Sequence, residues 1–323
     1  LLTDAERSYA EFTLSRVAGA AGNRRSEFEH LQRSVAAAEK AGHLERLGWA
    51  EVRLLALMDS VSESHCASAI HRIRRTVSCS GDPSLSAALH LVAADLDGKR
   101  GLLAKSQKHV SLAQSILSRY PNTWLRAWSE NTLLALALSQ SDLASAADHA
   151  HLALALGLES GSAVVIRHAH ANLGRLHYAM GSFDLAMESL ECALEMAAPQ
   201  SEHAFAIIDS IAQVRLAQGR LEDAEQSSAW VDAVPPHDRV SGAYIFRHSL
   251  VTRAEILKRL GRFSESTASY KAALTFAEKA EDALLRSRVV FADAATNDAA
   301  RAPIGNLRVG AMTPDQTIEY ESA

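Results

Sequence analysis

The chain has 323 residues and a formal net charge of -5, so it lacks the overall positive charge that a general nucleic-acid-binding surface requires. Its three cysteines, Cys66, Cys79 and Cys192, form no CxxC pair, which argues against a disulfide framework and a thiolate zinc site. No run of about 18 apolar residues is present that would span a membrane. Hydrophobic residues make up 48% of the chain, and Ala and Leu recur without the alternation typical of strands, so we expect an all-α fold.

The predicted elements are helices joined in pairs. The first helix begins with a capping box, in which Thr3 precedes Glu6 by three residues. It turns at Gly22 and Asn23 into a second helix that stops at Gly42. The same order of helix, turn and helix continues along the chain. The predicted pairs span residues 3–41, 44–79, 84–120, 122–157, 163–198, 201–234 and 238–281, and a last helix at 282–299 caps the array.

The spacing of the turns indicates an internal repeat. Turn markers fall at residues 22, 61, 101, 141, 181, 219 and 261, so successive intervals are 39, 40, 40, 40, 38 and 42 residues. A small residue recurs five positions after five of these turns, at Ser106, Ala146, Ala186, Ala224 and Ser266. We therefore predict one helical-repeat domain over residues 1–300, followed by a Pro- and Gly-containing tail or linker at 301–323.

The fifth pair shows the pattern most clearly. Its first helix has an apolar stripe at helical spacing, formed by Ala169, Leu173, Leu176 and Met180. Gly181 breaks the pattern, and Ser182 is a candidate N-cap of the next helix. The second helix has its own stripe, formed by Leu185, Ala186, Leu190, Ala193, Leu194 and Ala197. Gly174 costs about 1 kcal/mol against alanine inside a helix, so we expect the partner helix to approach closely there.

These residues resemble a known repeat. The segment His170-x2-Leu173-Gly174-x2-His177, followed by Ala186-x3-Leu190, Ala193 and Pro199, is similar to the tetratricopeptide pattern W-x2-L-G-x2-Y…A-x3-F…P. The small and apolar positions match. His170, His177 and Leu190 replace the family's aromatic residues, and Pro199 lies one residue late.

The period of about 40 residues leaves two repeat classes open. Tetratricopeptide repeats have about 34 residues and HEAT-type repeats about 40–47. We favour a long-period tetratricopeptide array because small residues recur at the helix crossing, Gly occupies five of the seven turns, and no regular proline begins the first helices. The resemblance implies a right-handed α-α superhelix of about seven hairpins, with the first helix of each pair lining the concave side.

By the same resemblance, one stripe of each first helix faces the concave groove. Asn and Arg side chains on rigid helices can hold the amides and carboxylates of an extended peptide, and a Trp can add an apolar contact. The chaperone-binding members of the family pair Asn with Lys, and those lysines are absent beside Asn131 and Asn172. The predicted groove residues are Trp128, Asn131, His168, Asn172, Arg175, Gln213 and His248.

Catalytic and metal-binding motifs are absent from the sequence. His168 and His170 point away from each other on one predicted helix, while His170 and His177 occupy the family's aromatic positions, so we interpret them as packed side chains. Glu188, Glu191 and Glu195 form a solvated helix face. No GxxxxGK[ST], GxGxxG, HExxH or GxSxG motif occurs. We therefore predict no catalytic residue, metal, cofactor or enzyme activity.

Three functional hypotheses remain open. The long-period, Arg-containing array is similar to the sensor or scaffold segments of bacterial regulators such as the maltose-type transcription activators. The first hypothesis is therefore a cytoplasmic sensor or interaction module that binds a peptide, a protein or a small effector. The second is a free-standing adaptor that scaffolds an assembly, with self-association as one route, and the third is an enzyme with its site inside the superhelix.

No direct contact with nucleic acid or membrane is expected of this chain. Without an initiator Met or a signal peptide, the sequence is interpreted as an excised or processed piece of a cytoplasmic protein.

Overall fold

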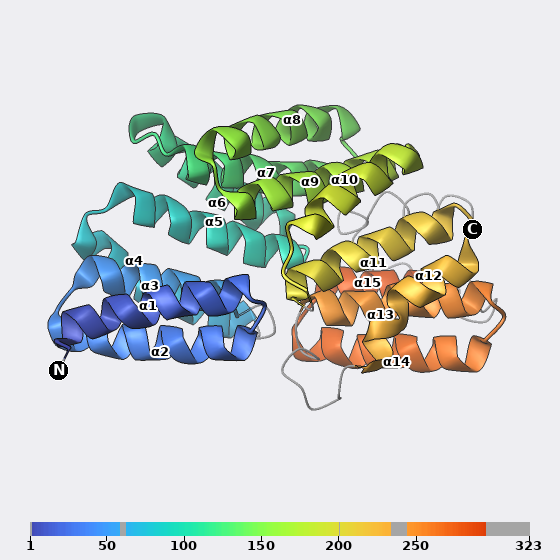
Figure 1. Cartoon of the computed structure of the whole chain (residues 1–323), viewed down its shortest axis with the longest axis horizontal. Helices are drawn as coiled ribbons and strands as arrows, with labels where there is room; N and C mark the ends of the chain where they lie inside the picture. The colour runs from blue at the N-terminus through green and yellow to red at the C-terminus, as the bar shows by residue number, and fades with distance from the viewer. Residues whose placement is uncertain (1, 59–62, 200, 234–243, 295–323) are drawn as a thin grey trace.

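The computed structural model describes residues 2–58, 63–199, 201–233 and 244–294, and these form fifteen α-helices and no strand (Figure 1). The all-α prediction is therefore confirmed. The helices are α1 (Asp4–Ala20), α2 (Arg24–Ala41), α3 (Leu44–Ala56), α4 (Glu63–Ser80), α5 (Pro83–Lys99), α6 (Leu103–Arg119), α7 (Thr123–Ser139), α8 (Leu143–Ser160), α9 (Ala163–Ala179), α10 (Phe183–Glu195), α11 (Glu202–Ala217), α12 (Leu221–Ser228), α13 (Tyr244–Arg259), α14 (Phe263–Lys279) and α15 (Ala283–Ala294). A short 3-10 helix, Ala229–Ala233, extends α12.

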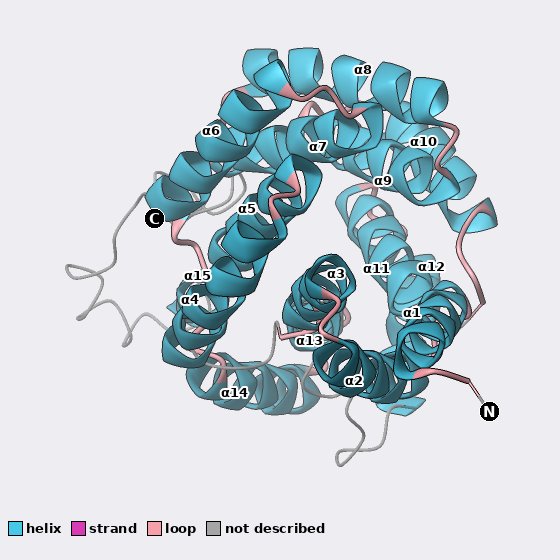
Figure 2. Ribbon diagram, turned by 90° about the vertical axis from the view of Figure 1, so that its left-hand side faces the viewer, coloured by secondary structure: helices cyan, strands magenta, loops and turns pink. Residues whose placement is uncertain are grey.

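Consecutive helices pack as hairpins, and the hairpins stack into a superhelix. Each odd-numbered helix up to α13 pairs with the next helix, and α15 covers the last hairpin by packing on α13 and α14. Helices α5, α7, α9, α11 and α13 line the inner side, while α6, α8, α10 and α14 lie outside (Figure 2). No single hairpin buries both of its faces, so stacking is what completes the core. The largest core cluster accordingly joins side chains of α3 to α7.

Local sequence explains where the hairpins turn. The predicted capping box is present, with Glu6 N donating to Thr3 Oγ1 at 3.2 Å and Thr3 N donating to Glu6 Oε2 at 2.8 Å. Six of the seven predicted turns lie in the described residues, and each has one residue with positive φ. Glycine adopts this conformation without steric cost, and five of the six are glycines. The residues are Gly22, Gly101, Ser141, Gly181, Gly219 and Gly261.

Small residues allow the two helices of a hairpin to approach. A Cβ added to Gly174 would lie 2.6 Å from Leu190 Cγ and 3.2 Å from the Ala186 carbonyl oxygen. The expected close approach of α9 and α10 is therefore confirmed. The small residues that follow the turns are all buried, and Ser106 and Ser266 also donate hydrogen bonds of 2.8 Å to the carbonyls of Ala94 and Ala254 on the partner helices.

One local prediction was wrong and a second was confirmed only in part. Helix α8 ends at Ser160 with Gly161 in the left-handed conformation, instead of ending near Gly157. Gly157 stays inside the helix because it packs against the start of α9, where an added Cβ would contact Val165 Cγ1 at 3.4 Å. Ser182 is the N-cap residue of α10 as predicted, and its carbonyl accepts from Ala186 N at 2.9 Å, but its side chain makes no capping hydrogen bond.

The predicted apolar stripes are buried only where helices cross. In α9 and α10, Ala169, Leu176, Leu190 and Ala193 are buried as expected. Met180 and Leu185 are 53% and 49% exposed, which corrects their assignment to the core stripes. They flank the hairpin tip, beyond the region that the neighbouring hairpin covers.

The first and last parts of the superhelix touch each other. Arg24 at the start of α2 forms a salt bridge with Glu202 of α11, and its guanidinium also donates to the Leu57 carbonyl at 2.8 Å. At a second point, Glu63 N donates to Glu281 Oε2 at 2.8 Å. These contacts join residues more than 170 positions apart, so the array closes on itself around its inner face (Figures 1 and 2).

Several predicted features lie outside the described residues. These are the turn at Val61 and Ser62, the stop at Pro235 and Pro236, the end of the capping helix at 295–299, and the tail at 301–323.

Candidate ligand-binding site inside the superhelix

The first two predicted groove residues lie on α7 and are already hydrogen-bonded within the protein. The indole of half-buried Trp128 donates from Nε1 to Asp95 Oδ2 on α5 at 2.7 Å, and its ring lies 5.6 Å from that of Trp124. Thr132 donates to the other oxygen of Asp95 at 2.9 Å. Asn131 is 7% exposed and donates to the Ala127 carbonyl at 3.1 Å.

The structure brings Asn131 and Asn172 together. Nδ2 of Asn172 on α9 donates to Oδ1 of Asn131 on α7 at 3.0 Å. The amide group of Asn172 remains half-buried. The two asparagines thus link neighbouring inner helices.

An equivalent link joins α11 to α13. Nε2 of Gln213 donates to Asp209 Oδ2 at 2.8 Å and to Thr252 Oγ1 at 3.3 Å. Thr252 in turn donates to Asp209 Oδ2 at 3.3 Å. Asp209 is only 4% exposed, and burial raises the pKa of its carboxyl despite these hydrogen bonds. Ser249 and the positive charge of Arg288 also act to lower this pKa.

His248 links α13 to α15. Its Nε2 atom lies 3.2 Å from Asp282 Oδ2, and its Nδ1 atom lies 3.3 Å from Arg288 Nη1. The same Asp282 oxygen accepts from Arg247 Nε at 2.9 Å. Burial opposes the ionisation of Asp282, but its contacts with His248 and Arg247 lower its pKa below the usual range. Asp282 is therefore ionised at neutral pH.

His168 and Arg175 lie on α9 outside these hydrogen-bonded links. His168 accepts a long contact of 3.4 Å from Arg167 Nη2, and its ring lies 5.3 Å from that of His203 on α11. Burial and the charges of Arg167 and Lys99 lower the pKa of His168 to about 4. Arg175 is exposed.

These contacts form a polar ladder along the inner face, which we call the inner ladder. It consists of Asp95, Trp128, Asn131, Thr132, Asn172, Asp209, Gln213, His248, Thr252, Asp282 and Arg288. The links join α5 to α7, α7 to α9, α11 to α13 and α13 to α15, so the side chains are held on rigid elements. Five of these residues are half-buried and the others are buried, so the half-buried ones are the candidates for contact with an extended chain: Asp95, Trp128, Asn172, Gln213 and Arg288.

The sequence prediction missed several members of this face, although the repeat contained the signal. Arg288 lies 40 residues after His248 and is in register with Trp128 and His168. Asp95 lies 80 residues before Arg175 and shares its register. Applying the 40-residue spacing of the predicted groove residues to α5 and α15 would have identified both residues.

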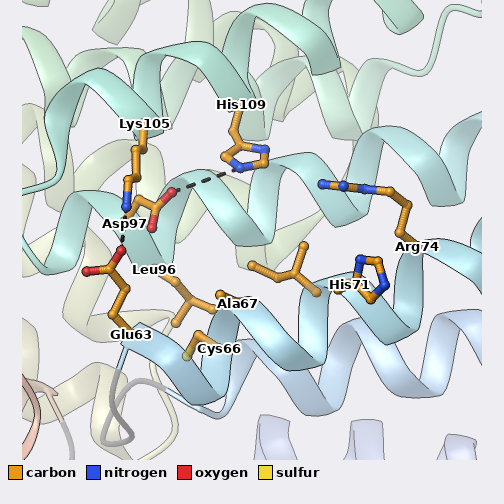
Figure 3. Close-up of a pocket in the computed structure, with 10 residues that line it drawn as sticks. Glu63, Cys66, Ala67, His71, Arg74, Leu96, Asp97, Lys105 and His109 are labelled. Atoms are coloured by element: carbon orange, nitrogen blue, oxygen red, sulfur yellow. Dashed lines mark hydrogen bonds and ion pairs between the residues drawn. The ribbon is translucent and has the colours of Figure 1, made fainter.

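The outer surface has a separate pocket of about 200 Å³ between α4, α5 and α6 (Figure 3). Glu63 and Lys105 form a salt bridge at one side, and Asp97 Oδ2 lies 4.0 Å from His109 Nε2. Burial raises the pKa of Asp97 to about 6, although the positive charges of Lys105 and Arg100 act to lower it. The pocket therefore contains a carboxyl that titrates near neutral pH.

This carboxyl should make stability depend on pH. Because the pKa of Asp97 is higher in the folded state than in the unfolded chain, its ionisation costs stability above pH 6, and stability rises as the pH falls from 6 to about 4. We expect Asp97→Asn to raise the melting temperature at pH 8 but not at pH 4. Asp148→Asn, at an exposed site on α8, is the matched control. An equal gain at both pH values would contradict the assignment.

A second outer depression, of about 410 Å³, lies beside α10 and is mainly acidic. Its carboxylates are Asp184, Glu188, Glu191 and Glu195, so the solvated face predicted for this helix is part of an open depression. Within the described ranges, no group of three or more His, Cys, Asp or Glu residues is arranged to hold a metal ion. No described helix is both long enough and apolar enough to traverse a bilayer.

Comparison with known proteins agrees with this architecture. Residues 168–199 match the family model of the tetratricopeptide repeat, and this is the segment whose residues carried the resemblance. A search of curated proteins found no match.

Three solved structures share the fold over most of the chain. A Rap protein in complex with Competence and Sporulation Factor has a TM-score of 0.63 and 12% identity, covering 98% of this chain and 86% of that one. The Rap conjugation gene regulator of plasmid pLS20, in complex with the Phr* peptide, has a TM-score of 0.57 and 13% identity, covering 94% and 83%. A signal transduction ATPase with a tetratricopeptide repeat sensor from Pyrococcus horikoshii has a TM-score of 0.51 and 13% identity, covering 84% and 44%. At this identity the similarity establishes the fold, a tetratricopeptide-like superhelix.

Proposed function

We propose that this chain is a non-catalytic module that binds a peptide or an extended protein segment on the inner face of its superhelix. The observation that carries the proposal is the inner ladder, whose polar side chains lie on successive rigid helices and face a common interior. Several of its members, Trp128, Asn172, Gln213 and Arg288, are only half-buried, so part of their surface is open to a ligand. Arg167 Nε is buried without a hydrogen-bond partner in the described residues.

One of the similar structures supports a peptide as the ligand class, since it is a complex with the Phr* peptide, and another is a complex with Competence and Sporulation Factor. The third belongs to a signalling ATPase in which the repeats are a sensor. We extend the proposal accordingly to a sensor or interaction domain of a bacterial signalling or transcription regulator that acts in the cytoplasm. An adaptor role, with self-association, is the alternative within the same binding mode.

The proposal is tested by selecting a displayed library of random dodecapeptides on the immobilised full chain. We expect enriched sequences, and we expect the affinity of a synthetic enriched peptide to fall at least about tenfold in the double variant Asn172→Ala, Arg175→Ala. Asn172 is half-buried on the inner face and Arg175 is exposed there, so the double variant removes two groups that can contact a ligand. Fluorescence anisotropy with the labelled peptide measures the affinity.

The matched control is the double variant Glu188→Ala, Glu191→Ala on the outer side of α10, which should bind the peptide as the parent does. A library that yields no enriched sequence, or a peptide that binds the inner variant and the parent equally, would refute binding on the inner face.

A further inference from the structure

The inner face carries excess positive charge, although the whole chain has a net charge of -5. Lys99 from α5 reaches across the interior, and its Nζ atom lies 5.3 Å from the centre of the Tyr244 ring on α13. Burial and the negative charge of Asp282 raise the pKa of Tyr244, while the positive charges of Arg175, Arg247 and Arg288 act to lower it. Arg247 Cζ lies 5.2 Å from the centre of the same ring. Cations from α5, α9, α13 and α15 therefore act on Tyr244 together with one carboxylate, Asp282.

Three of the inner arginines have no salt bridge to a described carboxylate: Arg167, Arg175 and Arg288. Arg167 is the most informative, because only 6% of its surface is exposed. Its Nε atom has no partner in the described part of the chain, and its Nη2 atom lies 3.4 Å from His168 Nε2. A buried guanidinium without an anion is costly, since burial removes its hydration without replacing it.

Structural arginines in the same protein are treated differently. Arg247, with 1% of its side chain exposed, is paired with Asp282 at 2.9 Å. Arg253, with 8% exposed, is paired with Asp232 at 2.7 Å and with Glu225 at 3.5 Å. Both of these buried arginines are compensated by a carboxylate, whereas Arg167 has no salt bridge to a carboxylate of the described residues.

The carboxylates of the inner face do not neutralise this charge. Asp282 is engaged by Arg247 and His248. Asp95 accepts hydrogen bonds from Trp128 and Thr132, and Asp209 accepts hydrogen bonds from Gln213 and Thr252. Acidic side chains gather instead in the depression outside α10. Charge is thus segregated, with a cationic interior and an acidic patch on the outer surface.

We propose that the ligand of the superhelix is a peptide rich in Asp and Glu, whose side-chain carboxylates bind Arg167, Arg175 and Arg288. This inference rests on the proposed function and adds the chemical class of the ligand. A guanidinium binds a carboxylate through two parallel hydrogen bonds, so arginines on α9 and α15 would fix both the orientation and the register of the peptide. An excess of cations over carboxylates on the inner face would also accelerate the entry of an anionic chain.

The test uses the full chain and an equimolar pool of random pentapeptides with amidated C-termini, with bound peptides identified by mass spectrometry. We expect Asp and Glu to be enriched at least about threefold over the input pool, and the enrichment to weaken as KCl is raised. Bound peptides without acidic enrichment would overturn the inference and leave the proposed function standing. The absence of any bound peptide would overturn the proposed function and this inference with it.

Two variants locate the contact. Arg175→Gln keeps hydrogen-bonding capacity but removes the charge of an exposed side chain, so it should fold normally and lose at least about tenfold in affinity for a selected acidic peptide. Arg175→Lys should restore part of the loss. Arg119→Gln, on the exposed surface of α6, is the matched control and should bind as the parent does. A pool with free C-termini is run in parallel, and binding that depends on the terminal carboxylate without preference for Asp or Glu would overturn the inference.

Discussion

Replacement of Gly174 by leucine is expected to lower the free energy of unfolding by about 3 kcal/mol or more, because the hairpin of α9 and α10 has no room for a side chain at its crossing. Even a single Cβ would lie 2.6 Å from Leu190 Cγ, and the Ala186 carbonyl on the other side belongs to rigid helical backbone. Leu190 is 1% exposed, so it cannot move into solvent. Because each hairpin supports the next, splaying this one should also loosen its neighbours.

The measurement is thermal unfolding followed by circular dichroism at 222 nm. Gly174→Ala should also destabilise the protein, although alanine favours the helix by about 1 kcal/mol, since overpacking outweighs that gain. Gly98→Ala is the matched control, because the added Cβ would meet only Ser106 Oγ at 3.4 Å, which is ordinary contact. A melting curve of Gly174→Leu identical to that of the parent would contradict the close approach of the two helices.

Asp282→Ala is expected to cost about 3–5 kcal/mol and to loosen α15 first, because it leaves the buried guanidinium of Arg247 without its carboxylate. The side chains of Arg247 and Asp282 are 1% and 0% exposed, so solvent cannot replace the lost charge. The variant also removes the N-cap of α15, in which Leu285 N donates to Asp282 Oδ1 at 2.9 Å. That cap contributes about 1 kcal/mol of the expected loss.

Asp282→Asn separates the two contributions, since asparagine can cap the helix but carries no charge. Hydrogen exchange measured by mass spectrometry should show loss of protection in α13 and α15 for both variants, and the loss should be smaller for Asp282→Asn. Asp223→Ala is the control, because its pair with Arg220 is 43% and 51% exposed and contributes at most about 1 kcal/mol. Unchanged protection of α15 in Asp282→Asn would show that the ion pair does not hold it.

For the candidate site, the sequence predicted only which positions of each repeat face the interior. Trp128, His168 and His248 were predicted because they belong to equivalent stripes of the first helices that the family resemblance places on the concave side, and all three lie on inner helices. The sequence did not show that Trp128 donates to Asp95 or that Asn172 donates to Asn131, because these bonds depend on how far each hairpin is rotated against the next. Small rotations between hairpins accumulate along the array and are set by side-chain packing.

The sequence by itself determined the helices, their pairing and the repeat. Gly181 turns the chain because glycine adopts a positive φ without steric cost. Gly174 lets two helices touch because it has no side chain. Both effects follow from the identity of a single residue. The closure of the array through Arg24 and Glu202 was decided by the tertiary structure. So was the convergence of Lys99 and Arg175 on Tyr244. These residues lie on different hairpins, and only the accumulated geometry of the whole superhelix sets the distances between them.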